Sequence, residues 1–495
     1  MSPSSPLYIT FALYIAVMVG IGFVAWRHTR SLDDYILGGR SLGSFVTAMS
    51  AGASDMSGWL LLGLPGALFL SGVSESWIAV GLVIGAWSNW KYVAAPLRAY
   101  TQRTRDALTL PDYFTHRFED GSRILRVLSA LVILVFFAIY SASGIVAGAR
   151  LFEAVFEVPY AQALWVGAAA TILYTLVGGF LAVSWTDTVQ ATLMIFALVL
   201  TPIVVILATG GPVASLAIIE QANPANLDFF RGGSVIAIIS LMAWGLGYFG
   251  QPHILARFMA AKSVASITAA RRISMTWMVL CLAGAMAVGF FGIAWFQAHP
   301  DKAALVTNPE RVFIALSQLL FNPWIAGVLL SAILAAIMST LSCQLLVCSS
   351  ALTEDFYKGF FRKEAGQAEL VWIGRLSVLL VSLLAIWIAS DPDSRVLGLV
   401  SYAWAGFGAA FGPVVLLSLC WKRMTRNGAL AGMVVGAATV LIWKQGGWFG
   451  LYEIVPGVIF ASIAIVMASL LGPPPSQAMQ QTFDDVQEDL RRAGA

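Results

Sequence analysis

The stretch from residue 41 to residue 74, SLGSFVTAMSAGASDMSGWLLLGLPGALFLSGVS, decides the fold of this chain. Asp55 is its one charged residue, and no other charge lies between Arg40 and Glu75. A lone carboxylate at membrane depth is costly and indicates a functional site. Residues 51–58 are small and rich in Gly and Ser, so we expect the helix to be interrupted there, with free backbone carbonyls. Because hard cations prefer oxygen ligands, the first hypothesis is a Na⁺ site inside a broken transmembrane helix.

The composition supports a membrane-embedded chain. Hydrophobic residues make up 59% and charged residues 11%, and the mean hydropathy is +0.81. About 20 apolar residues span a bilayer core, and the long Leu, Ala, Val and Gly runs do not fit the short alternating strands of an outer-membrane barrel. We therefore predict an all-α membrane protein with thirteen transmembrane helices. They are expected at residues 7–26, 44–70, 76–97, 127–149, 161–182, 186–208, 234–259, 275–296, 323–352, 371–390, 396–420, 428–443 and 452–471.

The basic residues predict the orientation of these helices. If the N-terminus lies outside, all but six of the 29 Lys and Arg residues fall on the cytoplasmic side. So uneven a distribution obeys the positive-inside rule. The sequence therefore predicts a periplasmic N-terminus, a cytoplasmic C-terminus and an odd number of helices.

The second and seventh predicted helices are both interrupted. The seventh contains residues 242–253, MAWGLGYFGQPH, whose three glycines and proline do not suit a continuous helix. Interruptions five helices apart predict two inverted five-helix repeats, spans 2–6 and spans 7–11. The alternative is that Gly and Pro serve close packing and kinks, as they commonly do in membrane helices. The predicted segments are 1–43 (first helix and loop), 44–233 (repeat 1), 234–420 (repeat 2), 421–472 (spans 12 and 13) and 473–495 (a partly helical cytoplasmic tail).

The ninth span carries a second polar group, Ser339, Thr340, Ser342 and Cys343, within about one helical turn. Hydroxyls in membrane helices usually bond back to their own backbone. A face of hydroxyls opposite an unwound segment could instead complete an oxygen cage for Na⁺.

Aromatic residues form the third group. Trp244 and Tyr248 are spaced i, i+4 and share a face if that segment is helical. Together with Tyr140 they could bury a small apolar ring and attract its ammonium group. A substrate carboxylate would then meet the N–H groups where a half-helix begins after Ser57 and Gly58. The alternative is ordinary packing or an interfacial belt.

Three further positions carry charged or titratable side chains. Two of them have a functional and a structural interpretation, and the third has a structural one. Asp187 is either a loop or N-cap aspartate or part of an inward ion path. Arg40, after Gly38 and Gly39, is either a gating hinge residue or a positive-inside anchor. The pair His253 and Arg257 is interpreted as structural. Since the sequence has no Walker motif, dinucleotide fingerprint, catalytic triad or nucleic-acid patch, neither an enzyme nor an ATP-driven pump is expected.

Five blocks of the sequence resemble the sodium:solute symporter family. They are ASDMSGW (53–59), GGFLAVSWTD (178–187), WGLGYFGQPHILARFM (244–259), LSAILAAIMSTLSCQLL (330–346) and SYAWAGFGAAFGP (401–413). The resemblance runs from about residue 7 to residue 471. It implies a leucine-transporter-like core, a bacterial inner-membrane location, and import of L-proline with Na⁺ by alternating access. Na⁺ would be the coupling ion, and no cofactor is implied.

The resemblance also implies roles for individual residues. It assigns Na⁺ to Ala53, Asp55, Met56, Ala336, Ser339 and Thr340. It assigns the substrate to Ser57, Gly58, Trp59, Tyr140, Trp244, Tyr248 and Pro252. Asp187, Ser342 and Cys343 match a possible second ion site or exit path, and Arg40 matches a gating position.

Two of these assignments carry a further expectation. Thiol sulfur is a poor ligand for a hard cation, so Cys343 favours one Na⁺ per solute. Asp55 is expected to supply a nearby negative charge, although direct ligation stays open. The remaining alternatives are Na⁺- or H⁺-coupled symport of another small solute, or a proline-binding membrane sensor.

Overall fold

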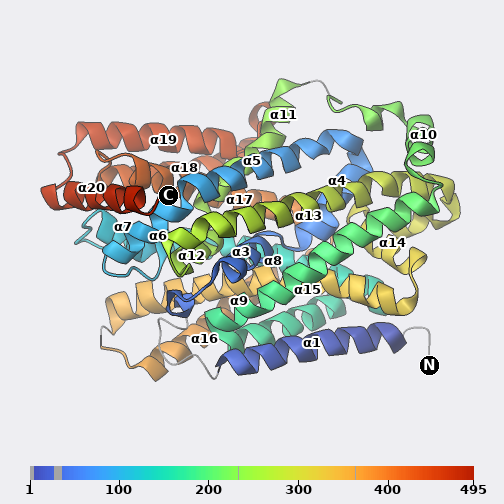
Figure 1. The fold of residues 1–495 in the computed structure, drawn as a ribbon, viewed down its shortest axis with the longest axis horizontal. Helices are drawn as coiled ribbons and strands as arrows, with labels where there is room; N and C mark the ends of the chain where they lie inside the picture. Colours follow the sequence, from blue (N-terminus) through green and yellow to red (C-terminus); the bar gives the residue numbers. More distant parts are fainter. Residues whose placement is uncertain (1–4, 27–35, 232–233, 363, 495) are drawn as a thin grey trace.

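The computed structural model describes residues 5–26, 36–231, 234–362 and 364–494. Its helices run side by side along the long axis of the molecule (Figure 1). They are α1 (Ser5–Trp26), α3 (Ser44–Asp55), α4 (Leu64–Ser71), α5 (Ser76–Tyr92), α6 (Ala94–Arg103), α7 (Leu110–Arg117), α8 (Ile124–Phe156), α9 (Tyr160–Ala208), α10 (Pro212–Ala222), α11 (Val235–Met242), α12 (Pro252–Ala260), α13 (Val264–Ala298), α14 (Val312–Leu320), α15 (Pro323–Ser350), α16 (Gln367–Ile388), α17 (Val396–Cys420), α18 (Arg426–Gly446), α19 (Ile454–Leu471) and α20 (Gln477–Arg492).

Short helical turns of the 3-10 or π type lie between several of these helices. They are η1 (Gly38–Arg40), η2 (Trp59–Gly63), η3 (Gly72–Glu75), η4 (Pro224–Leu227), η5 (Ala243–Gly250), η6 (Pro300–Val306), η7 (Pro309–Arg311), η8 (Ala351–Phe361) and η9 (Trp448–Gly450). Across the described residues, the one isolated extended pairing is a bridge between Leu42 and Ala261. The prediction of an all-α protein is confirmed.

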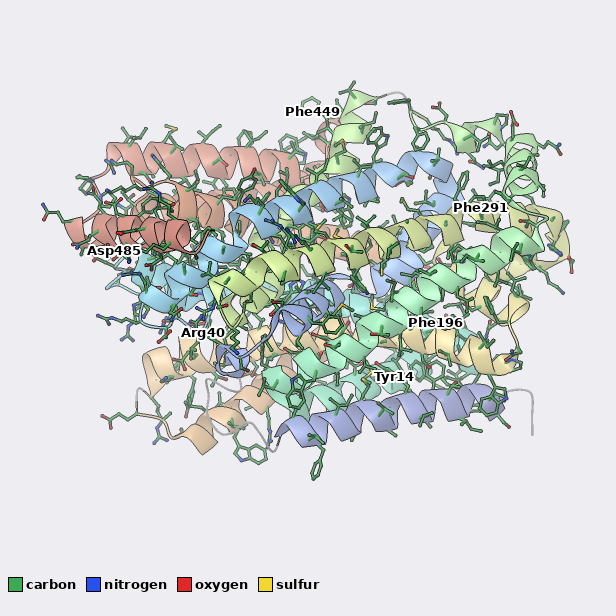
Figure 2. The ribbon with its side chains drawn as sticks, in the orientation of Figure 1. Tyr14, Arg40, Phe196, Phe291, Phe449 and Asp485 are labelled. Carbon is green, nitrogen blue, oxygen red and sulfur yellow. The ribbon has the colours of Figure 1, made fainter. Side chains whose placement is uncertain are left out.

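The described residues contain ten helices that are long and apolar enough to cross a membrane. The bent pair Val235–Gly250 and Pro252–Ala260, with 45° between its parts, makes eleven if it is one span. Large apolar side chains also point outward from the bundle, among them Phe196 and Phe449 (Figure 2). These features are those of a multi-pass membrane protein, whereas the predicted number of thirteen helices is not confirmed.

The difference in number arises in two places. Trp59–Arg103 is counted as one apolar stretch, although it covers much of the predicted second and third spans, and only Gly179–Ala208 of α9 is counted. The second place, α9, needs a physical explanation. This helix has 49 residues and covers the predicted fifth and sixth spans without a loop. At 1.5 Å per residue it would extend for about 73 Å, more than twice the thickness of a bilayer core. Gly179, at φ 66° and ψ −179°, breaks the helical geometry inside it. Residues of this conformation are normally glycine, which explains where the chain bends.

Both expected interruptions are present. α3 ends at Asp55, and Met56 leaves helical geometry with ψ 80° before η2 begins at Trp59. In the predicted seventh helix, Gln251 is extended at φ −81° and ψ 107° between η5 and α12. Pro252 then opens α12, a position where its missing N–H is tolerated. Each interruption therefore places helix ends, with free backbone groups, inside the protein.

A glycine contact fixes the second interrupted element against α5. A β-carbon added to Gly81 would lie 2.1 Å from the carbonyl oxygen of Met242, and one added to Gly85 would lie 2.1 Å from that of Gly245. A β-carbon on Gly245 would in turn lie 2.1 Å from the oxygen of Gly81. Real β-carbons do not approach backbone atoms so closely. These residues, called here the glycine seam, let two backbones touch directly.

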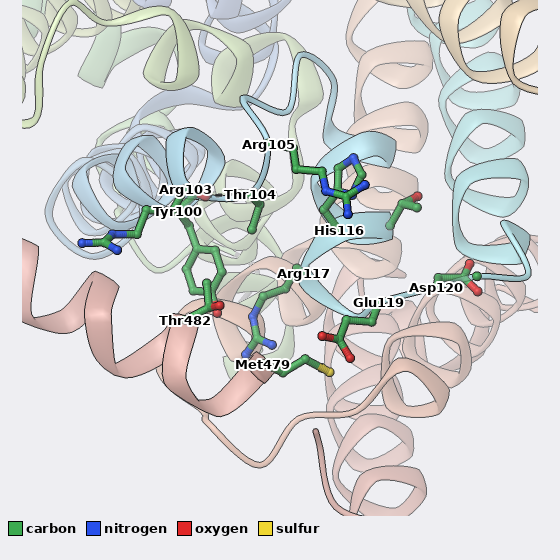
Figure 3. A pocket seen from close by; sticks show the side chains of 12 residues that line it. Tyr100, Arg103, Thr104, Arg105, His116, Arg117, Glu119, Asp120, Met479 and Thr482 are labelled. Atoms are coloured by element: carbon green, nitrogen blue, oxygen red, sulfur yellow. Dashed lines mark hydrogen bonds between the residues drawn. The ribbon is translucent and has the colours of Figure 1, made fainter. Parts of the chain in front are cut away.

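The tail forms a helix packed on the bundle. In α20, the apolar side chains of Met479, Phe483, Val486 and Leu490 are buried. Arg103 at the end of α6 binds Asp489 at 2.6 Å and Asp485 at 3.3 Å. Between α20 and the α6–α7 region lies a pocket (Figure 3), and none of the predicted site residues lines it.

Candidate functional site

The end of α3 presents backbone carbonyls that the helix cannot satisfy by itself. The Gly52 carbonyl still accepts the Met56 N–H at 2.9 Å. The Ala53 carbonyl instead accepts hydroxyl donors from α15, Ser339 at 2.8 Å and Thr340 at 3.3 Å. Two parts of the chain far apart in sequence therefore meet at one oxygen atom.

Four of the six residues predicted for Na⁺ lie together at this point. Besides its contact with Ala53, the Ser339 hydroxyl reaches the Ala336 carbonyl at 3.0 Å on its own helix. All of these oxygens are buried or nearly so. They also lie at the C-terminal, negative end of the α3 dipole, which favours a cation. An all-oxygen donor set of this kind fits Na⁺.

Among the described residues, no hydrogen bond joins Met56 or Ser342 to the Ala53 carbonyl. Met56 lies at the helix break and is fully buried. The Ser342 hydroxyl donates to the Ser339 carbonyl of its own helix at 3.1 Å.

Asp55 lies beside the cluster but makes other contacts. Its Oδ2 accepts the Tyr248 hydroxyl at 2.5 Å, which links the two interrupted elements. Its Oδ1 is buried with no hydrogen-bond partner in the described part of the chain. Among the ion pairs of the described residues, none includes Asp55. The side chain is 4% exposed, so its negative charge has little contact with water.

Aromatic side chains gather next to Asp55. The ring centres of Trp59 and Trp244 are 6.3 Å apart, and Trp244 lies 5.7 Å from Tyr452. Tyr248 meets Trp404 edge to face at 5.1 Å, and the Trp404 indole N–H donates to the Trp244 carbonyl at 2.7 Å. The expected aromatic wall therefore includes Trp404 and Tyr452, which the sequence analysis missed. Trp404 lies in a block that carried the family resemblance, whereas Tyr452 had no sequence signal.

The other residues expected at the substrate lie along the two breaks and α8. Ser57 follows the break, and its N–H donates to the Asp55 carbonyl at 3.0 Å. A β-carbon on Gly58 would lie 2.8 Å from that of Ala147 in α8. Tyr140, also in α8, is buried, and its ring meets that of His253 at 5.9 Å. Its hydroxyl has no hydrogen-bond partner within the described residues.

Asp187 is neither a loop residue nor an N-cap. It lies inside α9 and is fully buried. Its Oδ2 accepts the Ser50 hydroxyl at 2.6 Å and lies 3.5 Å from the Arg257 guanidinium. The Cys343 thiol is 3.8 Å from the same oxygen and also accepts a hydrogen bond from Arg257.

Arg257 is therefore the counter-ion of Asp187, a role that the sequence analysis did not assign. Both side chains are fully buried. Removing one partner of such a pair strands the other charge, which is strongly destabilising. The available signal was the single arginine in the apolar block WGLGYFGQPHILARFM.

Arg40 links three segments at the end of the bundle that carries α7 and α20 (Figure 2). It donates to the Met259 carbonyl at 2.8 Å, the Ala107 carbonyl at 2.9 Å and the Thr101 hydroxyl at 3.2 Å. Its guanidinium also lies 3.8 Å from Asp106. The side chain is only 12% exposed, so it is part of the packed structure.

These interrupted helices, with an oxygen cluster at the break, define a membrane transporter, and the chain belongs to the sodium:solute symporter family, whose model matches residues 35–436. It is 71% identical over 98% of its length to the sodium/proline symporter of Escherichia coli, covering 96% of that protein. It is 60% identical to the sodium/proline symporter of Haemophilus influenzae, with 99% of each chain covered. The high-affinity proline transporter of Bacillus subtilis is 53% identical, with 96% of this chain and 100% of that protein covered.

Solved structures show the same fold. A Na⁺-coupled sialic acid symporter in a substrate-bound outward-open state matches with a TM-score of 0.80 at 19% identity, covering 95% of this chain and 99% of that one. A nucleobase-cation-symport-1 family transporter matches with a TM-score of 0.57 at 14% identity, covering 91% and 98%. Both are transporters of the leucine-transporter fold.

Proposed function

We propose that this chain imports L-proline by symport with Na⁺, one ion per proline, through alternating access. The observation that carries the proposal is the meeting of the Ser339 and Thr340 hydroxyls with the Ala53 carbonyl beside the unpaired charge of Asp55. High identity to sodium/proline symporters over nearly the whole chain supports proline as the substrate. The activity is that of a carrier, so no catalytic residue is assigned.

Na⁺ is proposed to bind among the carbonyls of Ala53, Met56 and Ala336 and the hydroxyls of Ser339 and Thr340. The two hydroxyls donate to the Ala53 carbonyl. On binding, their oxygen lone pairs would turn to the cation. The bond between α3 and α15 would thereby be exchanged for a shared ion, which orders the break. Asp55 supplies the compensating charge.

Proline is proposed to lie against Trp59, Trp244 and Tyr248, with its ring on the aromatic faces and its ammonium attracted to them. Its carboxylate would meet the free N–H groups after Ser57 and Gly58, at the positive end of a half-helix. Tyr140 and the start of α12 at Pro252 complete the site. Since the Tyr248 hydroxyl donates to Asp55 at 2.5 Å, a hydrogen bond joins the proposed substrate position to the proposed ion position. Linkage then requires each ligand to raise the affinity of the other by the same factor.

The proposed topology has thirteen spans, with the N-terminus in the periplasm and the C-terminus in the cytoplasm of a bacterial inner membrane. Spans 2–6 and 7–11 form the inverted repeats, within segments 44–233 and 234–420. Arg40 acts at the inner gate, because it binds the end of α12 and the segment after α6 together. Asp187, Ser342 and Cys343 line an inward path in which Arg257 already holds a positive charge.

Uptake of labelled proline by proteoliposomes tests the proposal. A Na⁺ gradient should drive accumulation of proline, and collapsing only that gradient at fixed pH should abolish it. Loss of uptake on collapse of a pH gradient instead would indicate H⁺ coupling, and binding without accumulation would indicate a sensor. Competition by unlabelled sugars or other amino acids at the strength of proline would refute the substrate. Asp55→Ala with wild-type Na⁺ dependence would refute the ion site.

A further inference from the structure

A pocket opens on the predicted periplasmic side of the molecule, between α4, η7 and the start of α17. The residues that line it include Gly63, Gly66, Glu75, Glu310 and Arg395. Its volume is about 200 Å³, whereas a single water molecule needs about 10–15 Å³. The pocket is therefore large enough for a small organic molecule.

This pocket lies directly outside the proposed proline site. Gly63 is the last residue of η2, the element that begins with Trp59. A β-carbon added to Gly63 would lie 3.5 Å from the Trp59 side chain and 3.1 Å from that of Leu397, which also lines the pocket. About one helical turn thus separates the pocket from the aromatic side chains beside Asp55. A solute that enters from the periplasm would meet the pocket first.

Among the residues that line the pocket, three are charged, and one of these is already bound. The Glu310 carboxylate accepts the Val396 N–H at 3.2 Å and the Leu397 N–H at 3.1 Å, one on each oxygen. The N-terminal end of α17 thereby balances its charge. Glu75 and Arg395 each precede a helix, yet neither side chain caps that helix. Among the described residues, no ion pair includes either of them.

A free carboxylate and a free guanidinium in the lining of one pocket favour a ligand that carries both charges. Arg395 would repel a simple cation, and Glu75 and Glu310 would repel a simple anion. A zwitterion can instead place its ammonium group at the carboxylate and its own carboxylate at the guanidinium, whose fork of N–H donors matches a carboxylate. A free α-amino acid has this charge pattern.

We infer that this pocket is an outer station for the zwitterionic amino acid, which binds with its ammonium at Glu75 and its carboxylate at Arg395. The inference rests on the proposed function. From the station the solute passes Gly63 and reaches the site beside Trp59. Because the station is not the final site, it sets the rate of capture at low proline concentration. It does not set the affinity at equilibrium or the maximal rate of transport.

Two measurements test the station: initial rates of Na⁺-driven proline uptake by proteoliposomes, and equilibrium binding of labelled proline to the purified full-length protein in saturating Na⁺. Glu75→Gln and Arg395→Gln should each raise the half-saturating proline concentration for uptake about fivefold, the effect of losing one partly exposed ion pair. The maximal rate and the equilibrium dissociation constant should stay within about twofold of the wild type. Because a bridging ligand needs both charges, the double variant should lose little more than either single variant.

The matched controls remove the same charges outside the pocket. They are Glu220→Gln on α10 and Lys302→Gln in η6. Each should leave the half-saturating proline concentration within about twofold of the wild type.

The outcomes separate the station from the transport function. If the wild type takes up proline with Na⁺ while Glu75→Gln and Arg395→Gln behave like their controls, the station is refuted and the proposed function stands. A dissociation constant that rises as much as the half-saturation would place the effect at the inner site and would also refute the station. If the wild type shows no Na⁺-dependent uptake, both ideas fail together. Should Glu75→Gln not fold, Glu75→Asp, which keeps the charge, should retain most of the capture rate, and a loss as large as that of Arg395→Gln would overturn the inference.

Discussion

Replacing Ser339 with alanine removes one hydroxyl from the oxygen cluster at the end of α3. Its oxygen is fully buried, 2.8 Å from the Ala53 carbonyl, so water cannot readily replace it. A hydrogen bond or dipole contact with a charged group contributes about 1.5–3 kcal/mol. At 1.4 kcal/mol per factor of ten, the half-saturating Na⁺ concentration should rise about 10- to 150-fold.

The half-saturating Na⁺ concentration is measured from initial rates of proline uptake by proteoliposomes. The Na⁺ concentration is varied at constant pH, with choline replacing Na⁺. The matched control is Ser331→Ala on the same helix, because the Ser331 hydroxyl binds only its own helix at the Gly327 carbonyl, 2.8 Å away. The control should change Na⁺ half-saturation by less than about twofold. Equal shifts in the two variants, or a Na⁺ dependence of Ser339→Ala indistinguishable from that of the wild type, would refute the ligand role of Ser339.

Three other changes should give distinct results. Trp244→Ala should raise the half-saturating proline concentration about tenfold, since a buried cation–π contact is worth up to about 2 kcal/mol, and an unchanged uptake curve would contradict the aromatic wall. Arg257→Met should destabilise the protein by about 3–5 kcal/mol because Asp187 keeps its buried charge. Its melting temperature should partly recover when Asp187→Asn is added, and additive losses would argue against the ion pair. Although burial raises the pKa of Asp120, bonds from Ser122, the Leu125 N–H and Arg426 lower it overall. Asp120→Asn should therefore melt below wild type at neutral pH, and the gap should close as pH falls from about 3.9 through the lower folded pKa; a gap independent of pH would contradict this.

The location of the two helix breaks could be predicted because their signals are local. A carboxylate among Gly and Ser marked the break near Asp55, and three glycines and a proline marked the break before Pro252. The meeting of Ser339 and Thr340 with Ala53 depends on packing between distant helices. The family resemblance, and not spacing, led to the expectation that they meet.

The remaining features are properties of tertiary contact. Asp187 and Arg257 lie on different helices, and nothing in either local sequence shows that the two side chains face each other. The number of spans depends on similar detail, since α9 consists of two helices joined directly at the kink of Gly179, with no loop between them.

The glycine seam limits how this protein can be altered. Gly81, Gly85 and Gly245 leave no room for even a methyl group. Substitutions by progressively larger side chains are therefore not tolerated where α5 packs against the second break. Directed evolution toward a larger solute would find few viable variants there. Trp404 and Tyr452 are the adjustable positions, because they contact Tyr248 and Trp244 through their own side chains, which can be exchanged.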